Sequence, residues 1–180
     1  MEQKAYPAKT KAISRLSKRL IPAVFAGITL SIMVLLLEYF KTDVLYGIGI
    51  NAVIFASFAS SIYIMFIMPN SRAAKSSKFV KSYALAAVVG YLGGLTSSVL
   101  PLFAVAGMVI FVLTVLLILT YSEHPPAAAI AFAFVLFHVG ITGMVIIAAG
   151  VAIVLLSRFV LEKKIFEIER KIEKKKSTKA

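Results

Sequence analysis

The sequence predicts an all-α protein, a polytopic bundle of about six transmembrane segments. Three observations lead to this fold class. Of the 180 residues, 60% are hydrophobic and 16% are charged, whereas soluble domains carry about 25% charged residues. The apolar residues form long stretches, most of them close to the roughly 20 residues that a helix needs to cross the hydrocarbon core of a bilayer. The charges gather outside these stretches, so the apolar part has to lie in lipid.

The first four spans follow from their apolar runs. We expect them over residues 20–40, 45–68, 83–100 and 102–121. Polar residues at 41–43 separate the first two spans. A tight hairpin should join the third span to the fourth at Pro101, because proline cannot continue a helix interior.

The stretch 125–157 is more ambiguous. At 1.5 Å per residue a single helix would be about 50 Å long, which is too long for one crossing. We therefore expect a break around Gly140 and Gly143. This break leaves a short fifth segment over 125–138, which would span the membrane or re-enter it, and a sixth over about 142–157.

The basic residues test this count. Segments 1–19, 69–82 and 158–180 hold all but one of the 20 lysines and arginines, and such residues mark cytoplasmic loops. Six crossings place the three segments on one side, whereas five would put the basic tail outside. We expect a basic N-terminal segment over 1–19, a transmembrane domain over 20–157 and a basic tail over 158–180. The protein should lie in a prokaryotic cell membrane, with both termini in the cytoplasm.

Spans two and five are each the middle member of a triplet, and both have unusual openings. Span two contains a small, polar run, and span five opens with two prolines and three alanines. Three spans followed by three place the second half upside down, which predicts a 3+3 inverted repeat with its ligand site where broken helices end. The alternative is that small residues only let helices pack closely.

The start of span five is a candidate anion site. Pro125 and Pro126 predict the first turn of a helix, where their missing N–H groups cost nothing. His124 would then lie at or near the N-cap, with the amides of Ala127 and Ala128 as free donors at the positive end of the helix dipole. An anion suits this position. The alternative is a loop boundary with a solvated His124.

Nearby charges and the polar residues of span two complete the candidate site. Glu123 would weaken anion binding unless Arg72 or Lys75 neutralised it. Ser57 and Ser61 are four residues apart and share a helix face, so they could donate to an anion together with Ser60 and Asn51. Alternatively, each serine bonds the carbonyl of its own preceding turn. His138, beside the expected break, is either a proton relay or an ordinary interfacial histidine.

The run from Glu123 to Pro126, with the alanines after it, resembles the signature of the HPP membrane-protein family. Two further stretches are similar to the family pattern, namely Phe-Ala-Ser at 55–57 and again at 58–60, and Ser-Arg-Ala-Ala at 71–74. The resemblance covers about residues 20–157. It departs after 74, where family members often carry Pro-Arg and then a Gly-Gly or Gly-Tyr pair but this chain has Ser76, Ser77 and Lys81. Since some members are implicated in nitrite transport, the resemblance implies anion transport.

The basic tail has an apolar seam. Leu161, Ile165, Ile168 and Ile172 recur at helical spacing among glutamates and lysines. We expect a helix continuous with span six. Its seam would pack on another copy of the chain or lie on the anionic inner leaflet, where each Lys or Arg adds about 1 kcal/mol.

We therefore predict a transporter or channel for a small inorganic anion, nitrite or similar, bound between the starts of segments two and five. The alternative is a non-transporting membrane scaffold or subunit whose basic tail binds lipid or protein. No residue pattern suggests an enzyme, and with no cysteines we expect neither metal nor cofactor. The expected partners are the anion, inner-leaflet lipids and further copies of the chain. No motif for nucleic acid is present. The predicted binding residues are Asn51, Ser57, Ser60, Ser61, Arg72, His124, Pro125, Pro126, Ala127 and Ala128.

Overall fold

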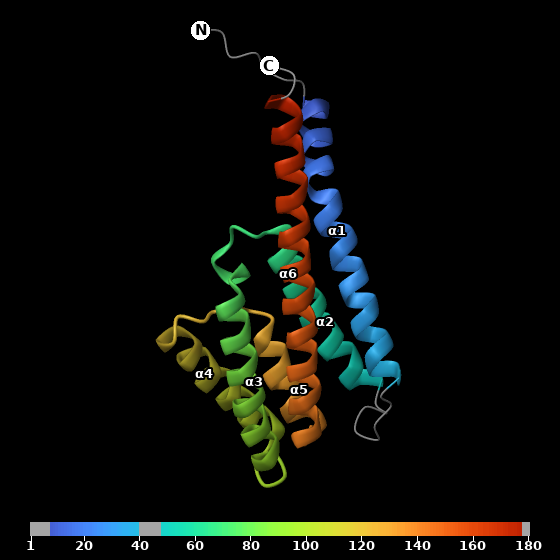
Figure 1. The fold of residues 1–180 in the computed structure, drawn as a ribbon. Coiled ribbons are helices and arrows are strands. Elements are labelled where there is room, and N and C mark those ends of the chain that lie inside the picture. The colour runs from blue at the N-terminus through green and yellow to red at the C-terminus, as the bar shows by residue number, and fades with distance from the viewer. Residues whose placement is uncertain (1–7, 40–47, 178–180) are drawn as a thin grey trace.

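The computed structural model describes residues 8–39 and 48–177, and within these ranges it contains only helices and their connections (Figure 1). The predicted all-α class is confirmed. The elements are α1 Ala8–Tyr39, α2 Ile48–Ile67, the short 3₁₀ helix η2 Arg72–Ala74, α3 Ser76–Thr96, α4 Leu102–Leu119, α5 Ala127–Phe137 and α6 Ile141–Ser177. By length and composition Ser76–Thr96, Leu102–Leu119 and Ile141–Ile165 can each cross a membrane, while Arg19–Leu35, Val53–Ile67 and Ala127–Phe137 are shorter apolar stretches.

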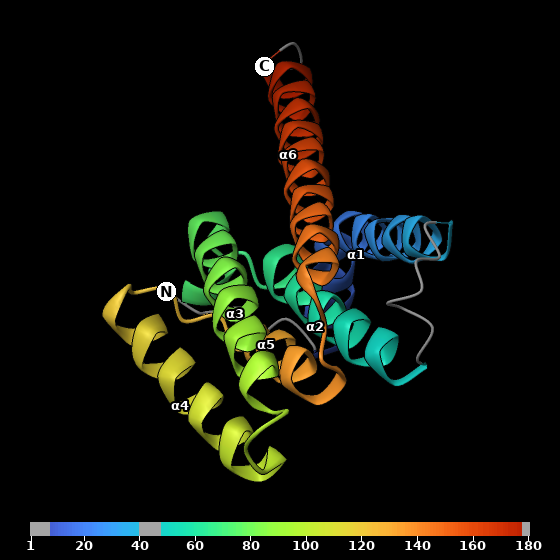
Figure 2. The ribbon, with the colours of Figure 1, turned by 90° about the horizontal axis from the view of Figure 1, so that it is seen from below.

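Helix α5 occupies the middle of the bundle. It packs against α2, α3 and α4, whereas α4 touches only α3 and α5 among its main neighbours and lies at the edge (Figure 2). On the other side α1 packs against α2 and α6. The residues that open α5 are therefore surrounded by protein.

The helix neighbours are unchanged when the two halves of the chain are exchanged. Let α1, α2 and α3 correspond to α4, α5 and α6 in that order. The contact of α1 with α2 then corresponds to the contact of α4 with α5, and the contact of α3 with α4 corresponds to the contact of α6 with α1. The contact of α3 with α5 maps onto that of α6 with α2, and the pairs α2 with α5 and α3 with α6 map onto themselves. Every main contact between the six α-helices has its counterpart under this exchange, while the inversion of the second half stays a prediction.

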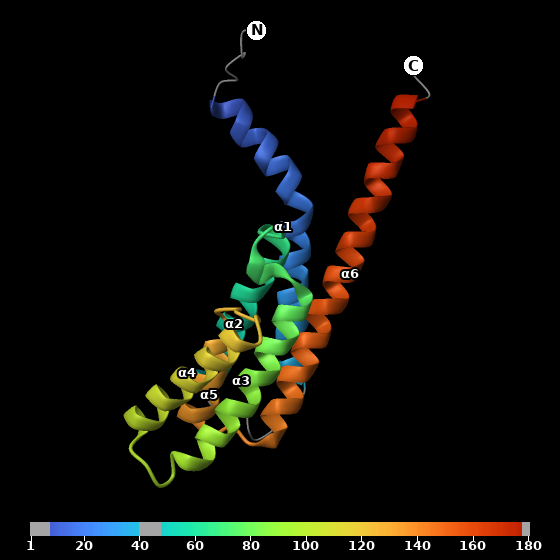
Figure 3. The ribbon, with the colours of Figure 1, turned by 90° about the vertical axis from the view of Figure 1, so that its left-hand side faces the viewer.

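Both ends of the described chain lie on the same side of the bundle. The start of α1 and the end of α6 extend beyond the other helices in the same direction (Figure 3). The connection through η2 and the connection 120–126 face this end, while the hairpin after α3 and the connection 138–140 lie at the opposite end. This arrangement brings the basic residues of 72–81 to the side of the two chain ends, as six crossings require.

The connection between α5 and α6 differs in detail from the prediction. Helix α5 ends at His138, which adopts a left-handed conformation with φ 50°, and the Val139 amide donates to the Phe134 carbonyl. Such a C-cap satisfies carbonyls at a helix end. The break thus lies at 138–140, which confirms the predicted break at Gly140, whereas its extension to Gly143 was wrong. Gly143 lies inside α6, where a Cβ would come within 2.0 Å of the Val139 side chain.

Helix α6 runs without interruption from the bundle into the basic tail, which confirms the predicted continuity. Leu161 of the apolar seam is buried and Ile165 packs partly against the core. The structure does not describe the side chains of Ile168 and Ile172, so their part of the seam stays a prediction. Helix α3 starts earlier than the predicted 83, because the basic residues before it form its first turns.

Candidate functional site

The interior of the bundle is apolar except for a few side chains. Among the described residues the buried polar side chains are Thr29, Ser57, Ser61, Ser82, Ser122 and His124. Thr29 and Ser82 donate to carbonyls of their own helices, as membrane serines and threonines commonly do. Ser57, Ser61 and His124 instead make contacts between different elements, which sets them apart.

These side chains form one continuous hydrogen-bonded chain with Tyr83. Ser57 Oγ donates to the Pro126 carbonyl oxygen at 2.6 Å and lies 2.8 Å from Tyr83 Oη. Tyr83 Oη lies 2.7 Å from Ser61 Oγ, which is 2.8 Å from His124 Nε2. His124 Nδ1 lies 2.8 Å from the Ala73 carbonyl oxygen. We call Ser57, Tyr83, Ser61 and His124 the polar chain.

Each member of the polar chain is held by a different local feature. Ser57 and Ser61 are one turn apart on α2, and Tyr83 of α3 bridges their hydroxyls. His124 lies in the connection 120–126, with its ring edge-on to Phe79 at a centroid distance of 5.4 Å. Tyr83 packs against Phe58 and Phe79. His124 and Tyr83 are both 0% exposed, so the aromatic rings pack tightly around the middle of the polar chain.

Three predicted site residues meet here, and a fourth contributes its backbone. Ser57, Ser61 and His124 are brought together, and Pro126 supplies its carbonyl. The solvated His124 of the alternative reading is excluded, because its side chain is fully buried. Tyr83 was not among the predicted site residues, because no spacing in the sequence links it to Ser57 or Ser61. Its hydrogen bonds to these two serines of α2 show its role.

The prediction that the amides at the start of α5 are free is wrong. The Ala127 amide donates to the His124 carbonyl at 3.0 Å and the Ala128 amide to the Pro125 carbonyl at 3.1 Å. The two prolines fix φ near helical values, so the chain closes a tight turn before the helix begins. Pro126, rather than His124, is the N-cap. Any anion recognition here must use side chains.

The remaining predicted site residues lie apart from the polar chain. Ser60 is exposed on the outer face of α2, because its position on the helix turns it away from Ser57 and Ser61. Asn51 lies in the first turn of α2, and its side chain is outside the described ones. Arg72 is exposed at the start of η2.

Charged side chains surround this end of the bundle. Lys78 of α3 forms an ion pair with Glu123 at 2.7 Å, so the direct partner of Glu123 is neither Arg72 nor Lys75. The hydrogen bond from Lys78 lowers the pKa of Glu123, and Arg72 adds a smaller effect. Arg158 of α6 donates to the Ala74 carbonyl. Arg158 also forms an ion pair with Glu162 at 2.8 Å. The local charge is positive, because this end holds more basic residues than the two glutamates, namely Arg72, Lys75, Lys78, Lys81 and Arg158.

The opposite end of α5 carries the second histidine. His138 Nε2 lies 3.0 Å from Ser97 Oγ, and its side chain is exposed. Between the two histidines α3 and α5 are in close contact, since a Cβ on Gly90 would lie 2.7 Å from Ala131 Cα. The polar chain is thus closed off from His138 by packed protein.

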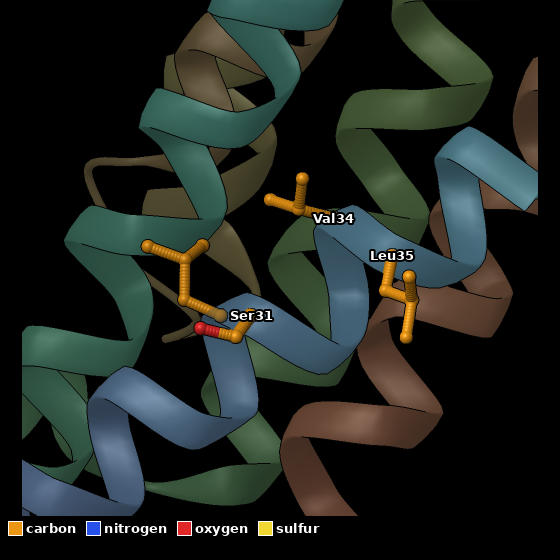
Figure 4. A pocket seen from close by; sticks show the side chains of 4 residues that line it. Ser31, Val34 and Leu35 are labelled. Carbon is orange, nitrogen blue, oxygen red and sulfur yellow. The ribbon is translucent and has the colours of Figure 1, made fainter.

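A shallow groove on α1 is separate from this site. Leu30, Ser31, Val34 and Leu35 line it, and all four belong to α1 (Figure 4). No residue of the polar chain contributes to the groove. It is therefore not a ligand cavity for the polar chain.

The burial of His124 predicts a pH-dependent stability. Burial lowers the pKa of His124, and the hydrogen bond to Ala73 opposes this shift. As pH falls below the ordinary histidine pKa of about 6.5, the unfolded chain binds a proton before the folded one does, so the free energy of unfolding decreases. We expect the midpoint of thermal unfolding in detergent to drop between pH 7.5 and 5. A flat profile would contradict this, and His124→Asn should reduce the drop.

Comparison with known proteins identifies the family. No curated protein and no solved structure matches the chain. The family model described as HPP, transmembrane region, matches residues 12–169, which include His124, both prolines and the serines of α2. Together with the apolar helices, this match makes the chain an integral membrane protein. Because the match covers most of the chain, the protein belongs to the HPP transmembrane-region family.

Proposed function

We propose that this protein transports a small monovalent inorganic anion, nitrite or a similar one, across the membrane. The polar chain carries this proposal, because it places three hydroxyls and an imidazole in the interior of an otherwise apolar bundle. Ser57, Ser61 and His124 are the donors that would hold the anion. The amides of α5 are not part of the site, since they are engaged in their own turn.

A purely structural role accounts poorly for the polar chain. Buried polar networks are costly where any group is left unpaired, and an apolar core would hold the helices without this risk. Both serines bond to other elements rather than to their own helix, and His124 joins them to the segment before α3. Ionisable groups within membranes commonly mark substrate or ion paths. Hydroxyls and imidazole can exchange their partners for a ligand.

The chemistry of the site favours an anion over a cation. The polar chain contains hydrogen-bond donors and no carboxylate, and Glu123 is engaged by Lys78. Among the described residues Ser71 Oγ is the one buried side-chain oxygen without a hydrogen-bond partner, and it lies two residues before Ala73. It offers a further donor. The basic residues around this end attract anions to it.

The position of the site fits a carrier. The polar chain joins α2 to the start of α5, and this helix pair maps onto itself when the halves of the chain are exchanged. In inverted-repeat transporters the substrate lies at such an interface, and one half rocks against the other. Weak binding by neutral donors would allow release.

Anion flux into proteoliposomes tests the proposal. We expect nitrite and nitrate uptake by the wild-type protein, and a loss of about tenfold or more in Ala128→Asp, since each 1.4 kcal/mol of repulsion is worth tenfold. Ala128 lies in the first turn of α5 and packs against the core. Ala149→Asp controls for the insertion of a charge at an exposed position of α6, and Ala128→Leu controls for added bulk at the packed position itself. If wild-type liposomes show no flux above empty controls, the scaffold alternative replaces transport.

A further inference from the structure

The polar chain has carbonyl oxygens at both of its ends. It runs from the Ala73 carbonyl through His124, Ser61, Tyr83 and Ser57 to the Pro126 carbonyl, which makes five contacts at hydrogen-bond distance. A carbonyl oxygen only accepts hydrogen bonds, whereas each hydroxyl has one proton to donate. The number of protons in the chain therefore decides how many of the five contacts are hydrogen bonds.

A neutral imidazole leaves the polar chain one proton short. His124, Ser61, Tyr83 and Ser57 then bring four protons to five contacts. If the proton on Nδ1 donates to the Ala73 carbonyl, Nε2 accepts from Ser61. The protons of Tyr83 and Ser57 then serve three contacts, so one of the contacts Tyr83–Ser61, Tyr83–Ser57 or Ser57–Pro126 is left without a proton. An imidazolium supplies the fifth proton and completes every hydrogen bond.

We propose that His124 is a proton-binding site whose occupancy is controlled by the polar chain, and that the proton moves together with the transported anion. The coupling rests on the proposed function, whereas proton binding does not. The proton comes from water and forms an N–H bond at Nε2. No other covalent bond changes in the net step, and the proton returns to water on release.

The hydroxyls can carry this proton. In the structure Ser57 donates to the Pro126 carbonyl. To receive a proton, the neutral chain turns Ser57 to Tyr83, so that the hydroxyls point towards His124, from Ser57 to Tyr83, from Tyr83 to Ser61 and from Ser61 to Nε2. When a proton arrives at Ser57, each hydroxyl passes its own proton onwards and Nε2 receives the last one. Every hydroxyl then points the other way, and Ser57 donates to the Pro126 carbonyl. The two arrangements differ by one proton and one hydrogen bond.

Two opposing effects keep both states accessible. Burial disfavours the imidazolium, whereas the extra hydrogen bond of the complete chain favours it. The charged groups around this end of the bundle are Arg72 of η2, Lys78 of α3 in its pair with Glu123, and Arg158 of α6 in its pair with Glu162. Their net positive charge also disfavours the imidazolium. A bound anion reverses this balance, because an ion pair is less costly to bury than a single charge.

Nitrogen-15 NMR of histidine in lipid nanodiscs tests the proton site without measuring transport. The chain has two histidines, so His138→Asn leaves His124 as the single signal. At pH 8 we expect the tautomer with the proton on Nδ1, and at acidic pH the imidazolium. Ser57→Ala, Ser61→Ala and Tyr83→Phe each remove the one-bond advantage of the charged state. Each should therefore lower the proton affinity about threefold to tenfold.

Ser82→Ala is the matched control, because Ser82 is buried on α3 but donates only to its own helix. It should leave the proton affinity unchanged. A proton on Nε2 at pH 8, or unchanged affinities in both Ser57→Ala and Tyr83→Phe, would overturn the proton site. Three hydroxyl variants keep the test valid if one of them fails to fold.

Proteoliposomes then separate coupling from transport. With equal nitrate on both sides and an acidic exterior, we expect the wild-type protein to accumulate nitrate, which does not cross bilayers as a neutral acid. Flux along a nitrate gradient without any response to the pH gradient would overturn the coupling and leave transport standing. No flux with either gradient would overturn the proposed function, and the NMR titration would still decide the proton site.

Discussion

Replacing Gly90 with alanine should destabilise the protein by about 2 to 3 kcal/mol. A Cβ at this position would lie 2.7 Å from Ala131 Cα and 2.8 Å from the Ala131 carbonyl oxygen. Both are backbone atoms of α5, so no side-chain rotation can relieve the clash. Helices α3 and α5 would have to separate, which would also displace the start of α5 from the polar chain. Chemical denaturation in detergent micelles measures the effect.

Gly107→Ala is the control for this experiment. Gly107 also lies in an apolar helix, α4, but a Cβ there would meet nothing within 4 Å. Alanine has the higher helix propensity by about 1 kcal/mol, so this variant should be neutral or slightly more stable. If both glycine variants unfold at the same denaturant concentration as the wild type, the close contact of α3 with α5 is not a feature of the folded protein.

Replacing His124 with asparagine should cost about 2 kcal/mol of stability at pH 8. Asparagine can still donate to the Ala73 carbonyl through its amide, but it cannot reach Ser61. The substitution therefore leaves the Ser61 hydroxyl without one partner and opens a small cavity beside Phe79. Thermal unfolding followed by circular dichroism in detergent measures the loss.

The same substitution at His138 is the matched control. His138 is exposed, makes one hydrogen bond to Ser97 and has a positive φ, which asparagine tolerates well. We expect a change of less than about 0.5 kcal/mol. Equal effects at the two histidines would show that burial and the polar chain do not distinguish His124.

The fold was largely predictable because its signals are local. Long apolar runs specify membrane helices whatever their neighbours, and Pro125 and Pro126 specify the start of α5 through their own fixed φ. The basic segments predicted an even number of membrane crossings, which stays a prediction. The position of the break between α5 and α6 was less predictable. His138 adopts a left-handed conformation that the sequence favours only weakly, and Gly143 lies inside α6 in close contact with the Val139 side chain.

The candidate site was predictable only in part. The shared face of Ser57 and Ser61 follows from helical spacing, and the family motif drew attention to His124. The partner of Glu123 and the role of Tyr83 could not be inferred, because both depend on how α3 lies against distant elements. The amides of α5 were wrongly expected to be free, since the turn formed by two prolines depends on the carbonyls before it.

The sequence by itself determined the number of helices, their apolar character and the polar side chains available to the interior. These properties follow from hydropathy, helical periodicity and proline geometry, which act over a few residues. The tertiary structure decided which of those side chains meet. Ser57, Tyr83, Ser61 and His124 come from three separate parts of the chain, and they form one hydrogen-bonded path because the tertiary structure brings α2, α3 and the connection 120–126 together.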